Sequence, residues 1–591
     1  MKSWWRQHQW DVIIVLGLAA FLLGLAGFAQ AGRGYPWLDC AYLSIQLFVL
    51  QSGAEVVSPP WMLEVARFVA PLTLSYAAVM GFLFFLRDHL RVWTMRWLRG
   101  HALIAGSGPA ALTLARQFRR QGLKVILVGG AEGDQAMAEA NAHGIPVLPG
   151  DPGDRHLLRD ARIDQAAWLV CLTGDDGSNL HVAMSAYELT RRRPPGDDAL
   201  RCRLELHDDR LRDLFVRHPV FSKESDRFEA EVFSRYEMAA RDLFDRFPLE
   251  TDDGGRLFPA AHLAIMGFGK LGRALLMQSA LIGHLASRRP LRLTVFDRGA
   301  ANWERRLRQR YPGLWECCDL TFVEGDLEDP TFSEGTWLGA PAVGPEMLTL
   351  AVCLEDAVLG LSRLLDLLEG LGDRPGRLLL RLRDGEGLAE LLRGCPGRPG
   401  GRPLHPFAVT TELFSWDNVV RSRLDSLARI IHDEYRRRRL ADGDSETTNP
   451  SLVSWSRLPE DLRVSNRRQA DHIPVKLRAL GLTCRPAPER PPDRGTPAPG
   501  ATTPLPRLFT FTPEQVEILS HLEHRRWNAD RFLSGWRRGP ADKPRRVSPW
   551  LVPYEELPEE IKEYDREAVR QIPTLLAAAG LEIVPLAPAT D

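Results

Sequence analysis

The feature that most limits the folds open to this chain is an uncharged run of residues from Val12 to Ala31. At 1.5 Å per residue, a helix over this run is about 30 Å long, which is the thickness of bilayer hydrocarbon. A second uncharged run extends from Phe68 to Leu86. A cleaved signal peptide has a shorter apolar core and is not followed by a second span. Residues 1–99 are therefore predicted to form a membrane module with two helical spans.

The flanking charges predict the orientation of the two spans. Lys2 and Arg6 precede the first span, whereas residues 32–67 between the spans hold only Arg33 and Arg67. Four arginines follow the second span, namely Arg87, Arg91, Arg96 and Arg99. The positive-inside rule then places both termini in the cytoplasm. We expect a multi-pass protein of the inner (plasma) membrane, in contact with lipid.

The connection between the spans is apolar over residues 38–53 but too short to cross a bilayer, which suits a re-entrant helix. This order of elements resembles the pore module of two-span potassium channels. The resemblance implies a homotetramer whose pore is lined by Gln51, Ser52, Gly53 and Glu55, with Glu55 as a ring that favours cations. The sequence there departs from the T-V-G-Y-G filter, so the ion stays open, with K⁺ as the family's ion. An extracellular amphipathic cap is the alternative for this segment.

Two glycine motifs predict a pair of dinucleotide folds. The first follows a short apolar strand at His101 and offers Gly106 and Gly108 before a helix that continues to Gln121. Glycine there permits a tight turn and the approach of a phosphate to the helix N-terminus. The next strand ends at Gly129-Gly130, where an acid that holds a ribose is expected.

The second motif has all three glycines, and its second strand ends in an acid. The candidate nucleotide-binding residues of this copy are Gly267, Gly269, Gly272, Asp297 and Asp326. We expect this copy to be the better nucleotide site. A degenerate fold kept for assembly is the alternative.

The residues after the first motif resemble the RCK domain (regulator of K⁺ conductance) over residues 100–218. A Gly150-Asp151 turn, a strand, Thr173-Gly-Asp-Asp176 and a helix carrying Asn179 support this. The resemblance implies two RCK-like domains, 100–250 and 251–395, that bind NAD(H) or another adenine nucleotide and act on the pore helices. No catalytic constellation follows either motif, and Asp175 and Asp176 are explained by helix capping. The eight cysteines form no C-x-x-C pair. We therefore expect neither an enzyme nor a metal site.

The C-terminal region contains an internal duplication. Residues 455–462 match residues 554–561 at an offset of 99 positions, and further pairs continue the match as far as Gly481-Leu482 and Gly580-Leu581. Upstream the offset is 92, as for His432 and His524. We expect two halves, 404–482 and 512–591, joined by a proline-rich linker at 483–511.

The second half resembles the RyR repeat of ryanodine receptors, most clearly over residues 513–581. The resemblance implies small helical units associated with nucleotide binding. Aromatic rings beside cations suit a base and its phosphates. The candidate ligand-binding residues are Trp527, Trp536, Arg537, Arg538, Trp550, Tyr554, His524 and Arg526. A small aromatic core beside a solvated arginine loop is the alternative.

The charge balance of 75 basic and 76 acidic residues argues against a nucleic-acid partner. The predicted fold class is a membrane α-helical module, then two α/β Rossmann-like domains and a C-terminal α-helical module. We expect an ion channel gated by a nucleotide or cyclic nucleotide. The alternative is a membrane-anchored nucleotide-sensing effector without a selective pore, acting in bacterial stress or phage defence.

Overall fold

The structure is a computed structural model that divides into two compact units, Met1–Leu98 and Arg99–Asp591. It describes residues 2–31, 34–50, 58–95, 97–130, 135–191, 193, 198–216, 227–287, 289–340, 344–372, 374–382, 392, 401–408, 413–420, 423–488 and 508–586. The predicted pore residues Gln51, Ser52, Gly53 and Glu55 lie outside these ranges.

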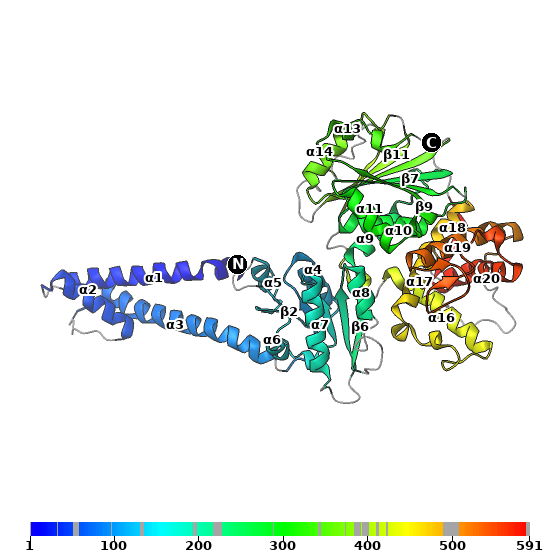
Figure 1. Ribbon diagram of the computed structural model, residues 1–591. Coiled ribbons are helices and arrows are strands. Elements are labelled where there is room, and N and C mark those ends of the chain that lie inside the picture. Colours follow the sequence, from blue (N-terminus) through cyan, green and yellow to red (C-terminus); the bar gives the residue numbers. More distant parts are fainter. Residues whose placement is uncertain are drawn as a thin grey trace, which may run out of the picture. The chain divides into compact units, whose positions relative to one another are not determined.

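The first unit is a helical hairpin with a short helix at its turn (Figure 1). Its elements are α1 (Lys2–Gln30), α2 (Trp37–Gln46), the 3₁₀ turn η1 (Leu47–Val49) and α3 (Trp61–Met95). Helices α1 and α3 lie side by side, and Gly27 permits their close approach because a Cβ there would lie 2.9 Å from the Leu63 nitrogen. A small core holds α1 against α2 and α3, with Ala20, Phe28, Leu43 and Leu63 among its members.

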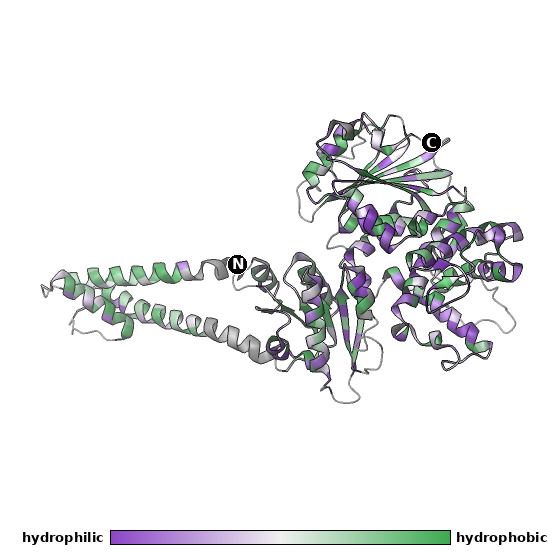
Figure 2. Ribbon diagram, in the orientation of Figure 1, coloured by the Kyte–Doolittle hydropathy of each residue, from purple (hydrophilic) through white to green (hydrophobic). Residues whose placement is uncertain are grey.

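Two segments of this hairpin are long and apolar enough to cross a membrane, Asp11–Gln30 and Trp61–Phe82. Figure 2 shows hydrophobic residues along both of them. The second segment starts earlier than predicted because α3 begins at Trp61. Large apolar side chains point outward on both helices, among them Ile14, Leu18, Phe68, Leu72 and Val79. The apolar helical stretch Trp37–Val49 is shorter than either segment.

The second unit begins with an α/β lobe built on a six-stranded parallel sheet in the order β3-β2-β1-β4-β5-β6. The strands are β1 (Ala102–Ala105), β2 (Val125–Val128), β3 (Val147–Leu148), β4 (Trp168–Cys171), β5 (Leu200–Glu205) and β6 (Phe228–Phe233). The helices are α4 (Pro109–Arg120), α5 (Gln135–Ala142), α6 (Arg155–Asp160), α7 (Asp176–Thr190), α8 (Asp209–Val216) and α9 (Arg235–Arg246). This strand order is that of a dinucleotide-binding fold, whose ligands bind at the carboxyl ends of the strands.

A second lobe repeats the same arrangement, with the sheet order β9-β8-β7-β10-β11-β12 and all neighbours parallel. Its strands are β7 (Ala260–Met266), β8 (Leu291–Asp297), β9 (Cys318–Glu324), β10 (Glu346–Val352), β11 (Gly376–Leu382) and β12 (Leu404–Ala408). Its helices are α10 (Lys270–Ile282), α11 (Ala300–Arg310), α12 (Leu314–Cys317), α13 (Pro330–Ser333) and α14 (Ala357–Leu367). Strand β12 extends this lobe to residue 408, beyond the predicted boundary at 395, and its Pro406 is tolerated because β12 is an edge strand.

The C-terminal module consists of two halves that share the same order of helices and a final strand, and the second half has two additional short strands. The first half has α16 (Ser426–Ala441), η8 (Trp455–Arg457), α17 (Glu460–Asp471), α18 (Ile473–Ala479) and β13 (Leu482–Pro486). The second half has α19 (Pro513–Leu533), β14 (Arg537–Arg538), β15 (Val547–Ser548), η9 (Tyr554–Glu556), α20 (Glu559–Arg570), α21 (Ile572–Ala578) and β16 (Leu581–Pro585).

The strands β13 and β16 pair antiparallel and join the two halves, with Cys484 opposite Ile583. These two residues are 99 positions apart, so a pseudo-two-fold axis passes between them. The structure therefore places Thr483–Pro486 in a strand rather than in the predicted linker. Residues 489–507 of that linker lie outside the described ranges.

Candidate functional site

The glycine turn of the first lobe joins β1 to α4. A Cβ at Gly106 would lie 2.4 Å from the Leu172 carbonyl oxygen, and its φ of +135° is one that glycine tolerates. Gly108 caps α4, and nothing lies within 4 Å of a Cβ placed there. The N-terminus of α4 is thus open toward the carboxyl edge of the sheet. Strand β2 ends at Val128, with Gly129 where a ribose-binding acid is expected.

The second glycine turn joins β7 to α10. Gly267 begins the turn after β7, and Gly269 caps α10 with open space around it. A Cβ at Gly272 would lie 2.4 Å from the Gly267 carbonyl oxygen, so the third glycine is what lets α10 pack against the turn.

Asp297 ends β8 beside this turn, at the position that the sequence pattern predicts. Its Oδ2 accepts a hydrogen bond from the Phe268 backbone nitrogen at 2.7 Å, and its Oδ1 accepts one from the Gly299 nitrogen at 2.8 Å. The carboxylate therefore braces the glycine turn, and each oxygen retains a lone pair for a ribose hydroxyl.

Asp326 follows β9, and its Oδ1 accepts from Arg298 at 2.9 Å. The hydrogen bond from Arg298 is the main cause that lowers the pKa of Asp326. This ion pair is largely exposed, so Arg298 is accessible to a ligand phosphate.

The second glycine turn lies near the first lobe. Lys270 is the first residue of α10, and its Nζ is 5.9 Å from the ring centroid of Tyr236 on α9. Burial lowers the pKa of His207, which follows β5, and the charge of Lys270 adds to that effect. Asp175 caps α7 by accepting from the Ser178 nitrogen at 2.7 Å, as predicted, and Lys270 contributes to its lowered pKa after that hydrogen bond. The charge of Lys270, at the second glycine turn, thus acts on His207 and Asp175, which lie at the carboxyl edge of the first sheet.

In the C-terminal module, the predicted ligand-binding residues separate into two sets. His524, Arg526 and Tyr554 are in the interior, with 2%, 3% and 3% of their surfaces exposed. His524 is hydrogen-bonded through Nε2 to the Val552 carbonyl at 2.8 Å, and Arg526 donates to Glu523 at 2.7 Å. These three side chains therefore belong to the interior of the module and not to its surface.

The other five predicted residues lie at the surface. Trp527 and Trp536 are half-buried, and Arg537, Arg538 and Trp550 are exposed. Arg531, which the sequence reasoning missed, lies between the two half-buried rings. Its guanidinium carbon is 5.3 Å from the Trp527 centroid and 5.0 Å from that of Trp536. Arg531 is four positions after Trp527 on α19, which is the spacing of side chains that meet on a helix. We call this set (Trp527, Arg531, Trp536, Arg537, Arg538 and Trp550) the aromatic surface.

The module is docked on both lobes. Asp471 at the end of α17 accepts two hydrogen bonds from Arg241 on α9, both at 2.9 Å, and one from Gln278 on α10 at 3.0 Å. Arg241 also donates to Asp425 at 2.8 Å. The Asp471 carboxylate is therefore a junction of the first lobe, the second lobe and the module.

Helix α19 makes further contacts with the second lobe. Arg525 donates to the Leu285 carbonyl at 3.2 Å, and a Cβ at Gly313 would lie 2.5 Å from Phe532 Cδ1. Leu533 of α19 and Val475 of α18 belong to the hydrophobic core of the second lobe. Beneath them, Arg526 and Lys476 lower the pKa of Glu523 to about 2, although burial acts to raise it. The helix that carries Trp527 and Arg531 is thus packed directly on the second lobe.

The described residues contain no group of three His, Cys, Asp or Glu side chains that could hold a metal ion.

Two family matches agree with these arrangements. Residues 102–218 match the TrkA-N domain, and residues 504–585 match the RyR domain. Among solved structures, the GsuK structure described as bound to ADP aligns with 70% of this chain and 98% of its own, at 17% identity and a TM-score of 0.36. The GsuK channel described as bound to NAD aligns with 72% and 85%, at 16% identity and a TM-score of 0.36. By its family matches, the chain carries a TrkA-N (RCK) domain in its first lobe and a RyR domain in the second half of its C-terminal module.

Proposed function

We propose that this protein is a nucleotide-gated, potassium-channel-like membrane protein. The helices α1 and α3 cross the membrane, four subunits enclose the pore, and the two lobes of each subunit contribute to a cytoplasmic gating ring. The C-terminal module is the ligand sensor. The TrkA-N and RyR family matches and the two apolar helices support this order of parts.

One observation carries the proposal: α19 joins a ligand surface to a docking surface within one rigid helix. Trp527 and Arg531 lie at the aromatic surface, whereas Arg525 and Phe532 of the same helix contact the second lobe. A ligand that moves Arg531 acts on a helix whose neighbouring side chains are fixed in the lobe. Two discrete positions of such an element are what a ligand can bias.

The ligand class follows from the chemistry of the aromatic surface. An adenine base is a flat ring that can replace the Arg531 guanidinium between Trp527 and Trp536. The displaced cation, together with the exposed Arg537 and Arg538, then faces the phosphates. Among these three arginines, Arg538 has a weak ion pair, 3.4 Å from Glu556. A cyclic or linear adenine nucleotide meets these requirements.

The path from the lobes to the membrane is short. Helix α3 ends at Met95 and β1 begins at Ala102, so six residues (96–101) separate them. The Gly100 nitrogen donates to the Gln165 carbonyl at 2.9 Å, which ties this segment to the first lobe. In this proposal, movement of that lobe reaches α3 through these six residues of chain.

The test is potassium flux from liposomes that contain the purified full-length protein, with adenine nucleotides, NAD and cyclic oligonucleotides added in turn. We expect one of these classes to change the flux, and W527A to abolish the response. The matched control is Y564A, because Tyr564 is an exposed aromatic residue of α20 outside the aromatic surface (69% exposed). Binding without any flux would refute conduction and leave a membrane-anchored sensor. Equal responses of W527A and Y564A would refute the ligand surface.

A further inference from the structure

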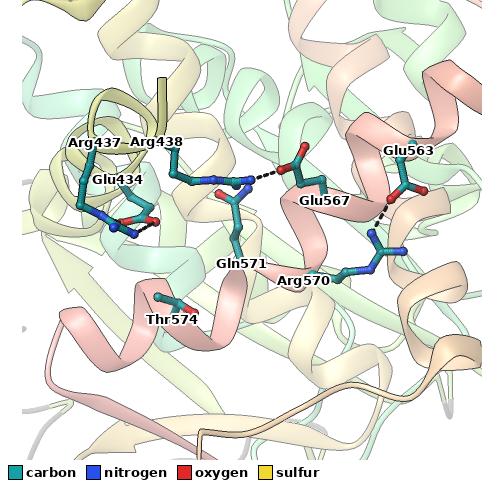
Figure 3. A pocket seen from close by; sticks show the side chains of 8 residues that line it. All are labelled: Glu434, Arg437, Arg438, Glu563, Glu567, Arg570, Gln571 and Thr574. Atoms are coloured by element: carbon teal, nitrogen blue, oxygen red, sulfur yellow. Dashed lines mark hydrogen bonds and ion pairs between the residues drawn. The ribbon is translucent and has the colours of Figure 1, made fainter. Parts of the chain in front are cut away.

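A polar groove of about 560 Å³ lies between α16 and the helices α20 and α21 (Figure 3). Its lining consists of three arginines, three glutamates and two neutral polar residues: Arg437, Arg438, Arg570, Glu434, Glu563, Glu567, Gln571 and Thr574. The volume is that of a small-ligand site. The groove contains no residue of the aromatic surface.

The internal repeat relates this groove to a face of the module that is already covered. At the offset of 92, Glu434 and Arg438 correspond to Arg526 and Asp530. At the offset of 99, Glu567 and Arg570 correspond to Arg468 and Asp471. The groove is thus the pseudo-symmetric counterpart of the face that docks on the two lobes.

The charge is reversed at all four of these positions, yet the geometry is retained. Arg438 pairs with Glu567 in the groove, and the equivalent residues Asp530 and Arg468 pair on the covered face. Because the same bridge joins the first helix of one half to the second helix of the other half on both faces, the shape of the groove is kept while its charges differ.

The uncharged positions also differ. On the covered face, Val475 packs into the core of the second lobe, and its counterpart in the groove is Thr574. Ala529 on the covered face corresponds to Arg437 in the groove. These replacements remove the apolar contacts that a protein lobe needs, so the groove suits a small hydrophilic occupant.

One of the three ion pairs of the groove can open to an anion without leaving its glutamate unpaired. Arg570 donates to Glu563 at 2.5 Å, but Glu563 has a second cation, Arg566, at 3.6 Å. An anion can therefore take Arg570 while Glu563 remains paired with Arg566. Arg570 and Glu563 are each 51% exposed, and exposed pairs contribute little stability. Arg437 donates two hydrogen bonds to Glu434, at 2.9 Å and 2.5 Å, and Arg438 pairs with Glu567, so a bound anion exchanges these carboxylate partners for phosphate oxygens, which suit the arginine fork.

We propose that this groove is a second ligand site, which binds a small polyanion through Arg438 and Arg570, with Arg437 and the neutral donors Gln571 and Thr574 beside them. The ligand class is a compact molecule that carries two or more negative charges, such as a pyrophosphate group. This site does not depend on the proposed nucleotide surface around Trp527.

The test is titration calorimetry of the full-length protein with inorganic pyrophosphate at low and high salt. We expect saturable binding that weakens with salt, a loss of roughly 10-fold or more in the R438Q/R570Q variant, and tighter binding in E563Q, because the competing carboxylate is removed. The matched control is R485Q, since Arg485 forms an exposed pair with Glu582 at 2.7 Å outside the groove. Unchanged binding in W527A would separate this site from the aromatic surface.

Three results would overturn the proposal. The first is no binding of pyrophosphate to the unmodified protein at millimolar concentration. The second is an equal loss in R485Q and R438Q/R570Q while circular dichroism shows both to be folded. The third is saturable binding of a polyamine that R438Q/R570Q leaves intact, which would show that the glutamates and not the arginines recognise the ligand.

Discussion

The junction at Asp471 gives the sharpest test of how the module is held on the lobes. In the D471N variant, one of the two Asp471 oxygens that accept hydrogen bonds from Arg241 is replaced by an amide nitrogen, which cannot accept a hydrogen bond. Removing one partner of a buried ion pair costs about 3–5 kcal/mol. The Arg241 and Asp471 side chains are 13% and 17% exposed, and Arg241 keeps its bond to Asp425, so we take about 2 kcal/mol as the loss in this case.

The assay is amide hydrogen exchange measured by mass spectrometry on the full-length protein. A single unfolding free energy is not well defined for a chain of several domains, whereas exchange reports local opening. A loss of about 2 kcal/mol corresponds to roughly 30-fold faster exchange in α9 and α17. The control is D444N, because Asp444 is partly exposed and lies 3.7 Å from Arg439 outside the junction. If D471N and D444N exchange alike in these helices, the pair does not hold the module and the reasoning is wrong.

Three further predictions concern the second lobe and its contact with the module. G272A should destabilise the lobe by about 1–3 kcal/mol because its Cβ meets the Gly267 oxygen, whereas G108A should have a small effect, and amide hydrogen exchange in β7 and α10 for G272A and in β1 and α4 for G108A checks this. D297N should speed exchange in β8 and in the glycine turn, because one of the two backbone N–H groups that donate to the carboxylate loses its acceptor, at a cost of about 1–3 kcal/mol. Burial lowers the pKa of His284 to about 3, so only the unfolded chain binds a proton there between pH 6.5 and 3, and stability falls as the pH is lowered through this window. The loss at pH 5 is about 2 kcal/mol for this residue, and H284N should show a smaller difference in melting temperature between pH 7 and pH 5 than the unmodified protein.

The elements that the sequence predicts well are those with local causes. The turn at Gly267, the acid at Asp297 and the cap at Asp175 each follow from a few neighbouring residues. The role of Asp297 in the fold was not predictable. Its carboxylate accepts hydrogen bonds from the Phe268 and Gly299 backbone nitrogens, which occupy part of it. Strand β12 was missed because residues 404–408 were assigned to the first half of the C-terminal module, and because Pro406 argues against a strand, although an edge strand tolerates proline.

The ligand surface shows a different limit of sequence reasoning. Arg526 stands beside Trp527 in the sequence, but the two side chains point to different sides of α19. The spacing gives a signal: Glu523 is three positions before Arg526 and Asp530 four positions after it, and both pair with it. The same rule applied to Trp527 identifies Arg531. Acidic partners on both sides of Arg526 at helical spacing are thus the sequence signal for its interior position.

The reversed charges of the two halves also explain why the module docks in one orientation only. Its pseudo-two-fold axis offers two faces of similar shape to the lobes. If the module were turned about that axis, Arg570 would take the place of Asp471 and meet Arg241. Two guanidinium groups in a site that is mostly buried repel each other at a cost of several kcal/mol. The duplicated fold thus gives the module two faces of similar shape. The charges of a few side chains decide that one face docks on the lobes, whereas the other is the proposed ligand groove.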